Sequence, residues 1–252
     1  MKRFYVAVAL LCALPLASLP VLAQTQSPED QKKAAAVRRA EFKKKAQTLV
    51  ASKTDRAKYA DFLKESNTGL IRLLPREKYI TEAYADVVRL PAQETSTTVG
   101  GRARDGGAYY SFSRLTHAYG YGSDLALESG RFGVGFAGAD YGFITDLGDV
   151  PLESVSLDTP EAKRLAAYAR ARQESDARLE SRRFQTGAEL DGVKVKSRVP
   201  MQPNSTYLLR AINYEQADVL VAFKVVEIDS EGTPLILWKR LKRYSTPQLA
   251  RY

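Results

Sequence analysis

Hydrophobic and polar positions in the first third of the chain recur with the period of a helix. After the cap and first-turn pair Ser27–Pro28, the segment QKKAAAVRRAEFKKKAQTLVAS contains few apolar residues, and most of them are alanine. This pattern predicts a charged helix with little surface to bury. A second helix is predicted from Thr54, with Tyr59, Phe62 and Leu63 along the edge that docks on the protein. The next segment, GLIRLLP, contains four aliphatic residues, and we expect it to be buried.

Between residues 100 and 149 the pattern changes to short alternating segments separated by glycine. This block holds 12 of the chain's 16 glycines, and such spacing is typical of strands joined by turns. Strands are predicted in YYSFSRL, DLALE, RFGVGFA and YGFIT. In RFGVGFA, alternation places core residues on one face and bare glycine backbone on the other. The core residues are Phe132, Val134 and Phe136, and the glycines are Gly133 and Gly135.

A further helical pattern, TPEAKRLAAYARARQESDARLESRR, predicts one helix over about residues 160–183. Thr159 is a suitable cap, and Pro160 fits the first helical position. The apolar stripe covers only the first half of this segment. We therefore expect the charged second half to lie in solvent.

The last third of the chain predicts an antiparallel meander through DGVKVKSRV, NSTYLLRAIN, DVLVAFKVVEID and TPLILWKRLKRY, with a turn at Asp191–Gly192. VLVAF and LILW are apolar on both faces, which indicates central strands covered on each side. The core should include Val221, Phe223, Ile236 and Trp238. The predicted fold class is α+β, with an antiparallel, sandwich-like core of two packed β segments, N-terminal helices, and one helix inserted between the β segments.

The first residues have the pattern of a bacterial signal peptide. Lys2 and Arg3 precede an apolar core, and a small-residue cleavage site ends at Ala23. The predicted organisation is a signal peptide over 1–23, a charged helical arm and helical subdomain over 24–90, and a β-rich domain over 91–252. Cleavage would remove Cys12, the single cysteine, so no disulfide is expected. We expect export to the periplasm or beyond, with no transmembrane segment in the mature chain.

The formal net charge is +9, but it is unevenly distributed along the chain. Residues 24–90 and 161–252 each carry a net charge of +6, whereas residues 91–160 carry −5. In VKVKSRV, Lys194, Lys196 and Arg198 alternate with valines, which predicts an exposed cationic stripe on a half-buried strand. Such a stripe either protects a sheet edge or contacts an anionic polymer. Nucleic acid is not an expected partner, because the chain has a signal pattern and no recognition motif.

Two clusters are candidates for chemistry. His117, the only histidine, has serines nearby and Asp124 seven residues further on, but neither G-x-S-x-G nor S-x-x-K occurs. The glycine face with Tyr119, Tyr121, Gly133, Gly135 and Asp140 would suit a sugar or another planar, hydroxyl-rich ligand, unless internal packing fills it. No metal site or cofactor is expected, because the mature chain would contain one histidine and no cysteine.

These patterns lead to two hypotheses of different class. The first is a non-enzymatic binding or structural protein of the cell envelope, whose partner is an anionic or carbohydrate polymer. The alternative is a hydrolase that acts on an envelope polymer through His117 with a nearby serine and aspartate. A buried His117 with one hydrogen bond favours the first hypothesis, and a cleft with serine and aspartate within reach favours the second.

Overall fold

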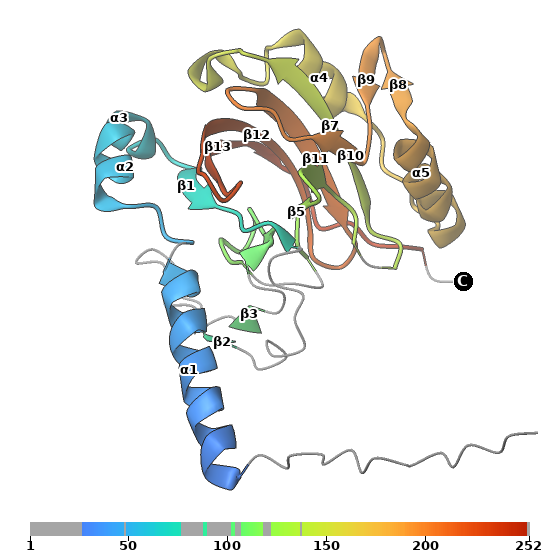
Figure 1. The fold of residues 1–252 in the computed structure, drawn as a ribbon. Helices are drawn as coiled ribbons and strands as arrows, with labels where there is room; N and C mark the ends of the chain where they lie inside the picture. Colours follow the sequence, from blue (N-terminus) through green and yellow to red (C-terminus); the bar gives the residue numbers. More distant parts are fainter. Residues whose placement is uncertain are drawn as a thin grey trace, which may run out of the picture. The chain divides into compact units, whose positions relative to one another are not determined.

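The structure, a computed structural model, describes residues 27–47, 49–76, 88–89, 102–103, 107–117, 122–136 and 138–250. The predicted signal peptide over 1–23 lies outside the described residues. The chain divides into two units, residues 1–37 and 38–252, and the described β structure belongs to the second. It is a mixed α/β fold with few helices and mostly antiparallel sheets (Figure 1).

Most of the helices and strands are short, and the longest strands come last in the chain. The helical elements are α1 (Pro28–Gln47), α2 (Lys53–Lys58), α3 (Ala60–Leu63), the 3-10 turn η4 (Leu152–Ser154), α4 (Pro160–Ala167) and α5 (Glu174–Thr186). The strands are β1 (Thr68–Arg72), β2 (Val88–Arg89), β3 (Arg102–Ala103), β4 (Tyr109–Tyr110), β5 (Leu125–Glu128), β6 (Arg131–Gly133), β7 (Tyr141–Gly148), β8 (Ala188–Leu190), β9 (Val193–Val195), β10 (Arg198–Pro200), β11 (Thr206–Asn213), β12 (Ala217–Ile228) and β13 (Pro234–Arg243).

Two antiparallel sheets make up most of the β structure in the described part of the chain. The large sheet has five strands in the order β1-β13-β12-β11-β7, and the small sheet has four in the order β10-β6-β5-β4. Strands β8 and β9 pair only with each other, through a two-residue turn at Asp191–Gly192 where both residues have positive φ. β11, β12 and β13 pair in chain order, which confirms the predicted meander for its last three segments. The first segment, DGVKVKSRV, does not continue it, because it divides into β9, which pairs with β8, and β10, which pairs with β6.

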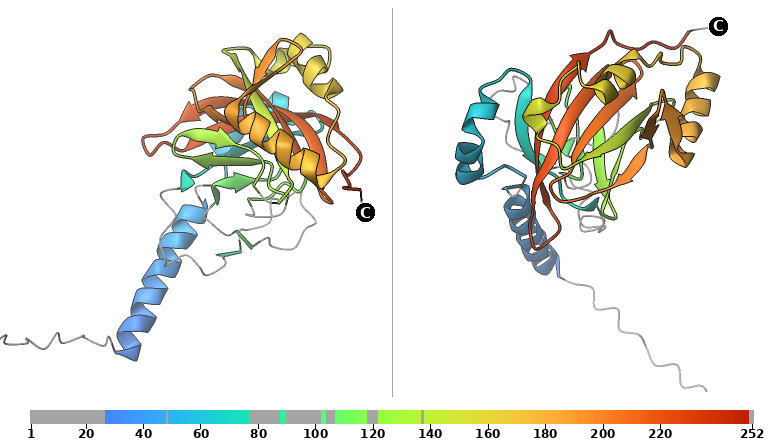
Figure 2. Two further views of the ribbon diagram at one scale, coloured as in Figure 1. Left: turned by 90° about the vertical axis from the view of Figure 1, so that its right-hand side faces the viewer. Right: turned by 90° about the horizontal axis from the view of Figure 1, so that it is seen from above.

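The large sheet carries a hydrophobic cluster on each face. One cluster joins it to α4 and α5 through side chains such as Leu165, Phe184 and Leu208. The other joins it to the small sheet through side chains such as Phe132 and Phe223. Figure 2 shows α4 and α5 over one side of the large sheet, with the small sheet on the other. VLVAF in β12 and LILW in β13 are consequently buried throughout, which confirms the expectation that these central strands are covered on both sides, and every residue of β11 is buried as well.

Burial agrees with the sequence pattern at most predicted core positions. Six of the seven expected core residues are buried, namely Phe132, Val134, Val221, Phe223, Ile236 and Trp238. GLIRLLP is buried as expected, because β1 pairs with β13 at one edge of the large sheet. Phe62 is buried, and Tyr59 and Leu63 pack on the same cluster, so this docking edge is confirmed. None of the described helices is both long and apolar enough to cross a membrane.

The single helix predicted over about 160–183 is wrong, because the chain leaves the helical conformation at Tyr168, where ψ is 124°. Tertiary hydrogen bonds replace the helical ones at this break. The amide of Ala171 donates to the Tyr141 hydroxyl at 2.9 Å, and the Tyr168 hydroxyl donates to Glu180 at 2.6 Å. The second helix, α5, is not free in solvent, since Ala177 and Phe184 on it are buried.

Two predicted strands are shorter than the sequence pattern suggested. YYSFSRL forms β4 over its first two residues and then turns, with Leu115 at φ 55°. RFGVGFA forms β6 only as far as Gly133, and Gly135 has φ 81°. This left-handed conformation ends the alternation of side chains, so Phe136 does not join the core face of Phe132. Phe136 is half-buried and packs against Tyr109 instead, with ring centroids 5.3 Å apart.

Candidate functional site

His117 is a buried side chain with one hydrogen-bond partner among the described residues. Its Nε2 lies 2.8 Å from the carbonyl oxygen of Arg72 in β1, so Nε2 carries the hydrogen and donates it. The imidazole contacts the edge of the Tyr110 ring, with centroids 4.9 Å apart. Burial lowers the pKa of His117 to about 4, although the bond to the Arg72 carbonyl opposes this shift. The neutral imidazole therefore joins the segment that follows β4 to β1, at one edge of the large sheet.

Asp124 is fully buried and binds the turn that follows β4. Its Oδ2 accepts hydrogen bonds from the amides of Phe112 at 2.7 Å and Ser113 at 3.3 Å, and from the Ser111 hydroxyl at 3.3 Å. Its Oδ1 accepts from Nδ2 of Asn213 in β11 at 2.7 Å. Burial raises the pKa of Asp124 to about 7, and these hydrogen bonds oppose the rise.

The predicted catalytic set is only partly assembled. Ser111, Ser113 and Asp124 lie together, and the two serine hydroxyls are 3.0 Å apart. Within the described residues, no hydrogen bond joins His117 to a serine or an aspartate. The oxygens of Asp124 accept instead from backbone amides, the Ser111 hydroxyl and Asn213. These contacts are those of residues that hold a turn and two sheets together.

The predicted glycine face is divided between two environments. Gly133 faces outward from the small sheet, where a Cβ would lie 3.6 Å from Arg198 and 3.7 Å from the Phe136 ring. The space left beside Gly133 is about 10 Å³, about the minimum for one water molecule. At Gly135 a Cβ would lie 2.9 Å from the Cα of Tyr141, so glycine is needed for close backbone approach and for its positive φ. The two glycines do not share a face, which corrects the predicted register.

The predicted ligand site also included Asp140, Tyr119 and Tyr121. Asp140 accepts a hydrogen bond from the amide of Tyr214 at 2.8 Å, and burial raises its pKa to about 6. Tyr119 and Tyr121 lie outside the described residues. A ligand role for this set stays a prediction.

The cationic stripe is exposed as predicted. Lys194, Lys196 and Arg198 point to solvent, and Val193, Val195 and Val199 are buried. The stripe lies where the large sheet meets the chain that leads to β10. The amide of Ile144 in β7 donates to the Lys196 carbonyl at 2.7 Å, and the Lys196 amide donates back at 3.0 Å. β7 is the edge strand of the large sheet opposite β1, and this bridge fixes the stripe beside it.

Two adjoining cavities surround the stripe. A larger one of about 550 Å³ lies between β7, the end of α5 and the β8–β9 pair. A smaller one of about 330 Å³ lies over β10 and the start of β6. Lys196 and Val199 line both cavities. Their volumes fall within the usual range of small-molecule sites, roughly 300–1,000 Å³.

The charges around these cavities are incompletely paired. Arg198 lies 3.3 Å from Glu128, which also binds Arg76 at 2.5 Å. Lys194 and Lys196 form no ion pair with any residue that the structure describes. The stem of Lys196 passes over Gly187 at the end of α5, where a Cβ would lie 2.8 Å from its Cε. The glycine thus gives room for a lysine held at the junction of the two cavities.

Sequence reasoning did not place Arg131, Asp146 and Glu189 beside the stripe, where they line the two cavities. Arg131 reaches the stripe because it pairs with Pro200 across β6 and β10, and Glu189 because it pairs with Lys194 across β8 and β9. The turn at Asp191–Gly192 was a usable signal for Glu189, since a two-residue hairpin fixes its register. No local pattern indicated that β6 and β10 pair.

No set of three or more metal-binding side chains lies together in the described part of the chain. Comparison with protein-family models, with curated proteins and with solved structures finds no match for this chain.

Proposed function

We propose that this chain is an exported, non-enzymatic binding or structural protein of the bacterial cell envelope, and that its cationic stripe contacts an anionic or carbohydrate polymer. The observation that carries the proposal is the position of Lys194, Lys196 and Arg198. They are exposed, and they line two adjoining cavities at the edge of the large sheet. A stripe that only protected a sheet edge would not need cavities of ligand size beside it.

The hydrogen bonds of His117 and Asp124 support a non-enzymatic role. His117 is buried and its Nε2 is used by the Arg72 carbonyl, so within the described residues it is bonded to no hydroxyl that it could activate. The hydrolase alternative would require His117 to leave this bond and approach Ser111 or Ser113. We rank it second for that reason.

We also propose that the two sheets form a sandwich-like frame that holds the stripe rigidly. Phe132 of the small sheet packs edge-on against both Tyr207 and Phe223 of the large sheet, with ring centroids 5.3 Å and 5.1 Å away, which supports this arrangement. Rigid elements position a binding surface better than loops do.

Export rests on the signal pattern of residues 1–23. Mass spectrometry of the secreted chain should find Gln24 at its N-terminus. A full-length product retained in the membrane would contradict export.

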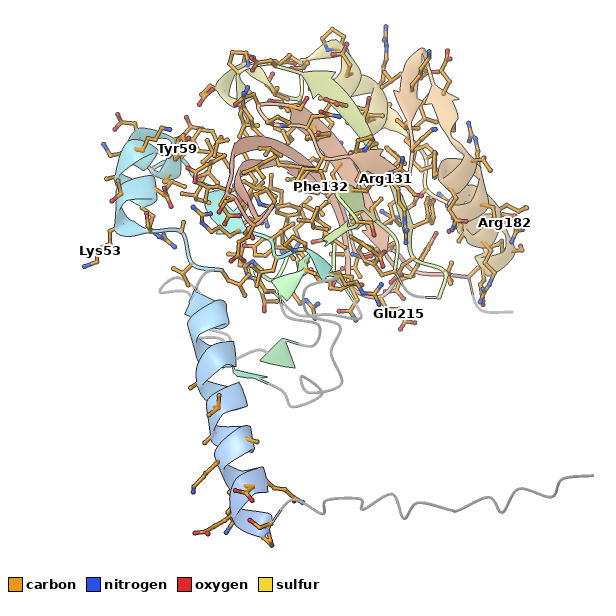
Figure 3. All side chains as sticks on the ribbon, in the orientation of Figure 1. Lys53, Tyr59, Arg131, Phe132, Arg182 and Glu215 are labelled. Carbon is orange, nitrogen blue, oxygen red and sulfur yellow. The ribbon has the colours of Figure 1, made fainter. Side chains whose placement is uncertain are left out.

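A pull-down from bacterial envelope fractions tests the binding role. The wild-type chain is compared with a stripe variant, Lys194→Ala with Lys196→Ala and Arg198→Ala, and with a matched control, Lys53→Ala with Arg56→Ala and Lys163→Ala. The control removes the same charge from exposed side chains on α2 and α4, and Lys53 is labelled in Figure 3. We expect the stripe variant alone to lose capture. Equal capture by all three chains would refute the proposal.

A further inference from the structure

The two cavities that meet at Lys196 differ in chemistry. The smaller one is lined by Arg131, Lys196 and Arg198, with polar contributions from Gln185 and Ser197 and no carboxylate among the described residues. The larger one is lined by Asp146 and Glu189 as well as by Lys194 and Lys196, together with Thr145 and Thr186. One side of the junction therefore attracts anions, and the other offers groups that accept hydrogen bonds.

The smaller cavity suits a single anionic group. Three cations line it, and only Arg198 has a carboxylate partner within the described residues, Glu128 at 3.3 Å. Neighbouring like charges repel, and an oxyanion placed among them removes that repulsion and accepts charge-assisted hydrogen bonds. Arginine binds phosphate and carboxylate oxygens in a two-pronged geometry, so both anions fit.

The larger cavity suits a neutral part that is rich in hydroxyl groups. Asp146 is held in place because its Oδ1 accepts hydrogen bonds from the Ser205 hydroxyl at 2.9 Å and the Gly148 amide at 2.8 Å. Its Oδ2 accepts no hydrogen bond from the residues that the structure describes, so it is available as an acceptor. Glu189 lies opposite Lys194 in the β8–β9 pair, and the two form no ion pair in the described structure. A hydroxyl between them can donate to the glutamate and accept from the lysine.

We propose that the paired cavities bind a sugar that bears an acidic substituent, either a phosphate or a carboxylate. The anion occupies the smaller cavity, the sugar hydroxyls face Asp146 and Glu189 in the larger one, and Lys196 lies between them. This inference rests on the proposed function, because it names the ligand class of the same stripe. Two simpler ligand classes, a uniformly anionic chain and a neutral sugar, fit the paired cavities less well. A uniformly anionic chain leaves Asp146 and Glu189 in the larger cavity without a donor. A neutral sugar leaves Arg131 and Lys196 in the smaller cavity without an anionic partner among the described residues.

Calorimetric titration of the mature chain with small probes tests the ligand class. The probes are glucose 6-phosphate, glucose 1-phosphate, glucuronate, glucose and inorganic phosphate. We expect at least one sugar acid to bind about tenfold or more tightly than either glucose or inorganic phosphate. The phosphorylated sugars and glucuronate distinguish the two sources of the anion. Binding of inorganic phosphate as tightly as any sugar acid, or no sugar-acid binding at all, overturns the inference.

Substitutions at two exposed residues identify which cavity holds the anion and which holds the sugar. Glu189→Gln should weaken binding of the sugar acid about tenfold, because a charged acceptor is lost, and leave inorganic phosphate unaffected. Arg131→Gln should weaken binding of both. Arg56→Gln on α2 is the matched control and should change neither. Tighter binding of the sugar acid to Glu189→Gln would show that its anionic group lies beside Glu189 and would overturn the assignment.

These results are separable from a failure of the proposed function. If envelope capture depends on the stripe but no sugar acid binds, the ligand class is wrong and the binding role stands. If envelope capture is independent of the stripe and no sugar acid binds, both are wrong.

Discussion

The turn around Asp124 and the stripe beside β7 both concentrate polar groups, but they use them differently. The carboxylate of Asp124 is buried, and four groups of its own chain donate to it. Lys194 and Lys196 are exposed and form no ion pair within the described residues. A buried charge must be satisfied internally to be tolerated, whereas an exposed charge is solvated and remains available to a partner. The first region therefore contributes to folding, and the second to recognition.

The largest expected effect comes from removing the buried carboxylate. Asp124→Ala leaves the amides of Phe112 and Ser113 and the amide group of Asn213 without their acceptor. We expect the free energy of unfolding to fall by roughly 3–5 kcal/mol, measured by denaturant titration. Asp158→Ala, at an exposed position, is the control and should change it by less than about 0.5 kcal/mol. A loss below about 1 kcal/mol for Asp124→Ala would show that this carboxylate does not hold the turn.

The next largest effect on stability distinguishes Gly135 from Gly133. Gly135→Val places a branched side chain at φ 81° and against the backbone of Tyr141, so we expect a loss of roughly 2–4 kcal/mol. Gly133→Ala meets only ordinary contacts from Arg198 and Phe136, so a change below about 1 kcal/mol is expected. Thermal and denaturant melts of both variants measure the difference. Equal losses would restore the register in which the two glycines share a face.

A smaller effect is the pH dependence of stability. The folded pKa of Asp124, about 7, lies above its ordinary value of 3.8, so the folded state binds the proton more tightly. Its contribution therefore lowers the free energy of unfolding as pH rises from about 4 to 7. The pKa of His117, about 4, lies below 6.5, so the unfolded state takes the proton and the contribution has the opposite sign.

Single substitutions reveal these opposed contributions. Relative to the wild type, Asp124→Asn should make the free energy of unfolding rise more with pH, and His117→Gln should make it rise less. Each slope changes by at most about 1.4 kcal/mol per pH unit, the value for one proton. Denaturant titrations between pH 4 and 7 measure both slopes, because each group changes its protonation within this interval in either the folded or the unfolded state. Unchanged slopes would mean that neither group is as buried as the structure indicates.

The smallest expected effect on stability belongs to the stripe. Replacing Lys194, Lys196 and Arg198 with alanine should change the free energy of unfolding by less than about 0.5 kcal/mol, because the side chains are exposed. Binding of the wild type to envelope polymers should weaken as salt rises, and any residual binding of this variant should depend less on salt, since fewer counterions are released. Denaturant melts and binding at several salt concentrations measure the two effects. A large loss of stability would assign the stripe to folding instead.

Much of the difference between buried and exposed positions could be predicted from the local sequence pattern. Alternation in VKVKSRV placed three cations outward and three valines inward, because successive side chains on an extended chain point to opposite faces. Because the side chains of a strand point to both faces, the continuous apolar runs in β12 and β13 predicted that a layer covers each face of these strands. Local pattern failed at Gly135 and Tyr168, where one backbone dihedral angle ended a strand or a helix.

The sequence by itself determined which side chains are buried and which are exposed along each regular strand, because strand periodicity and the hydrophobic effect act on neighbouring residues. Only the tertiary structure decided which segments meet. The pairing of β6 with β10 brings Arg131 to the stripe, and the bridge from Ile144 to Lys196 sets the stripe at the sheet edge. These contacts join residues more than 50 positions apart, and their register depends on the packing of the whole sheet. The stripe could be predicted from the sequence, whereas the cavities beside it form only when distant segments pack together.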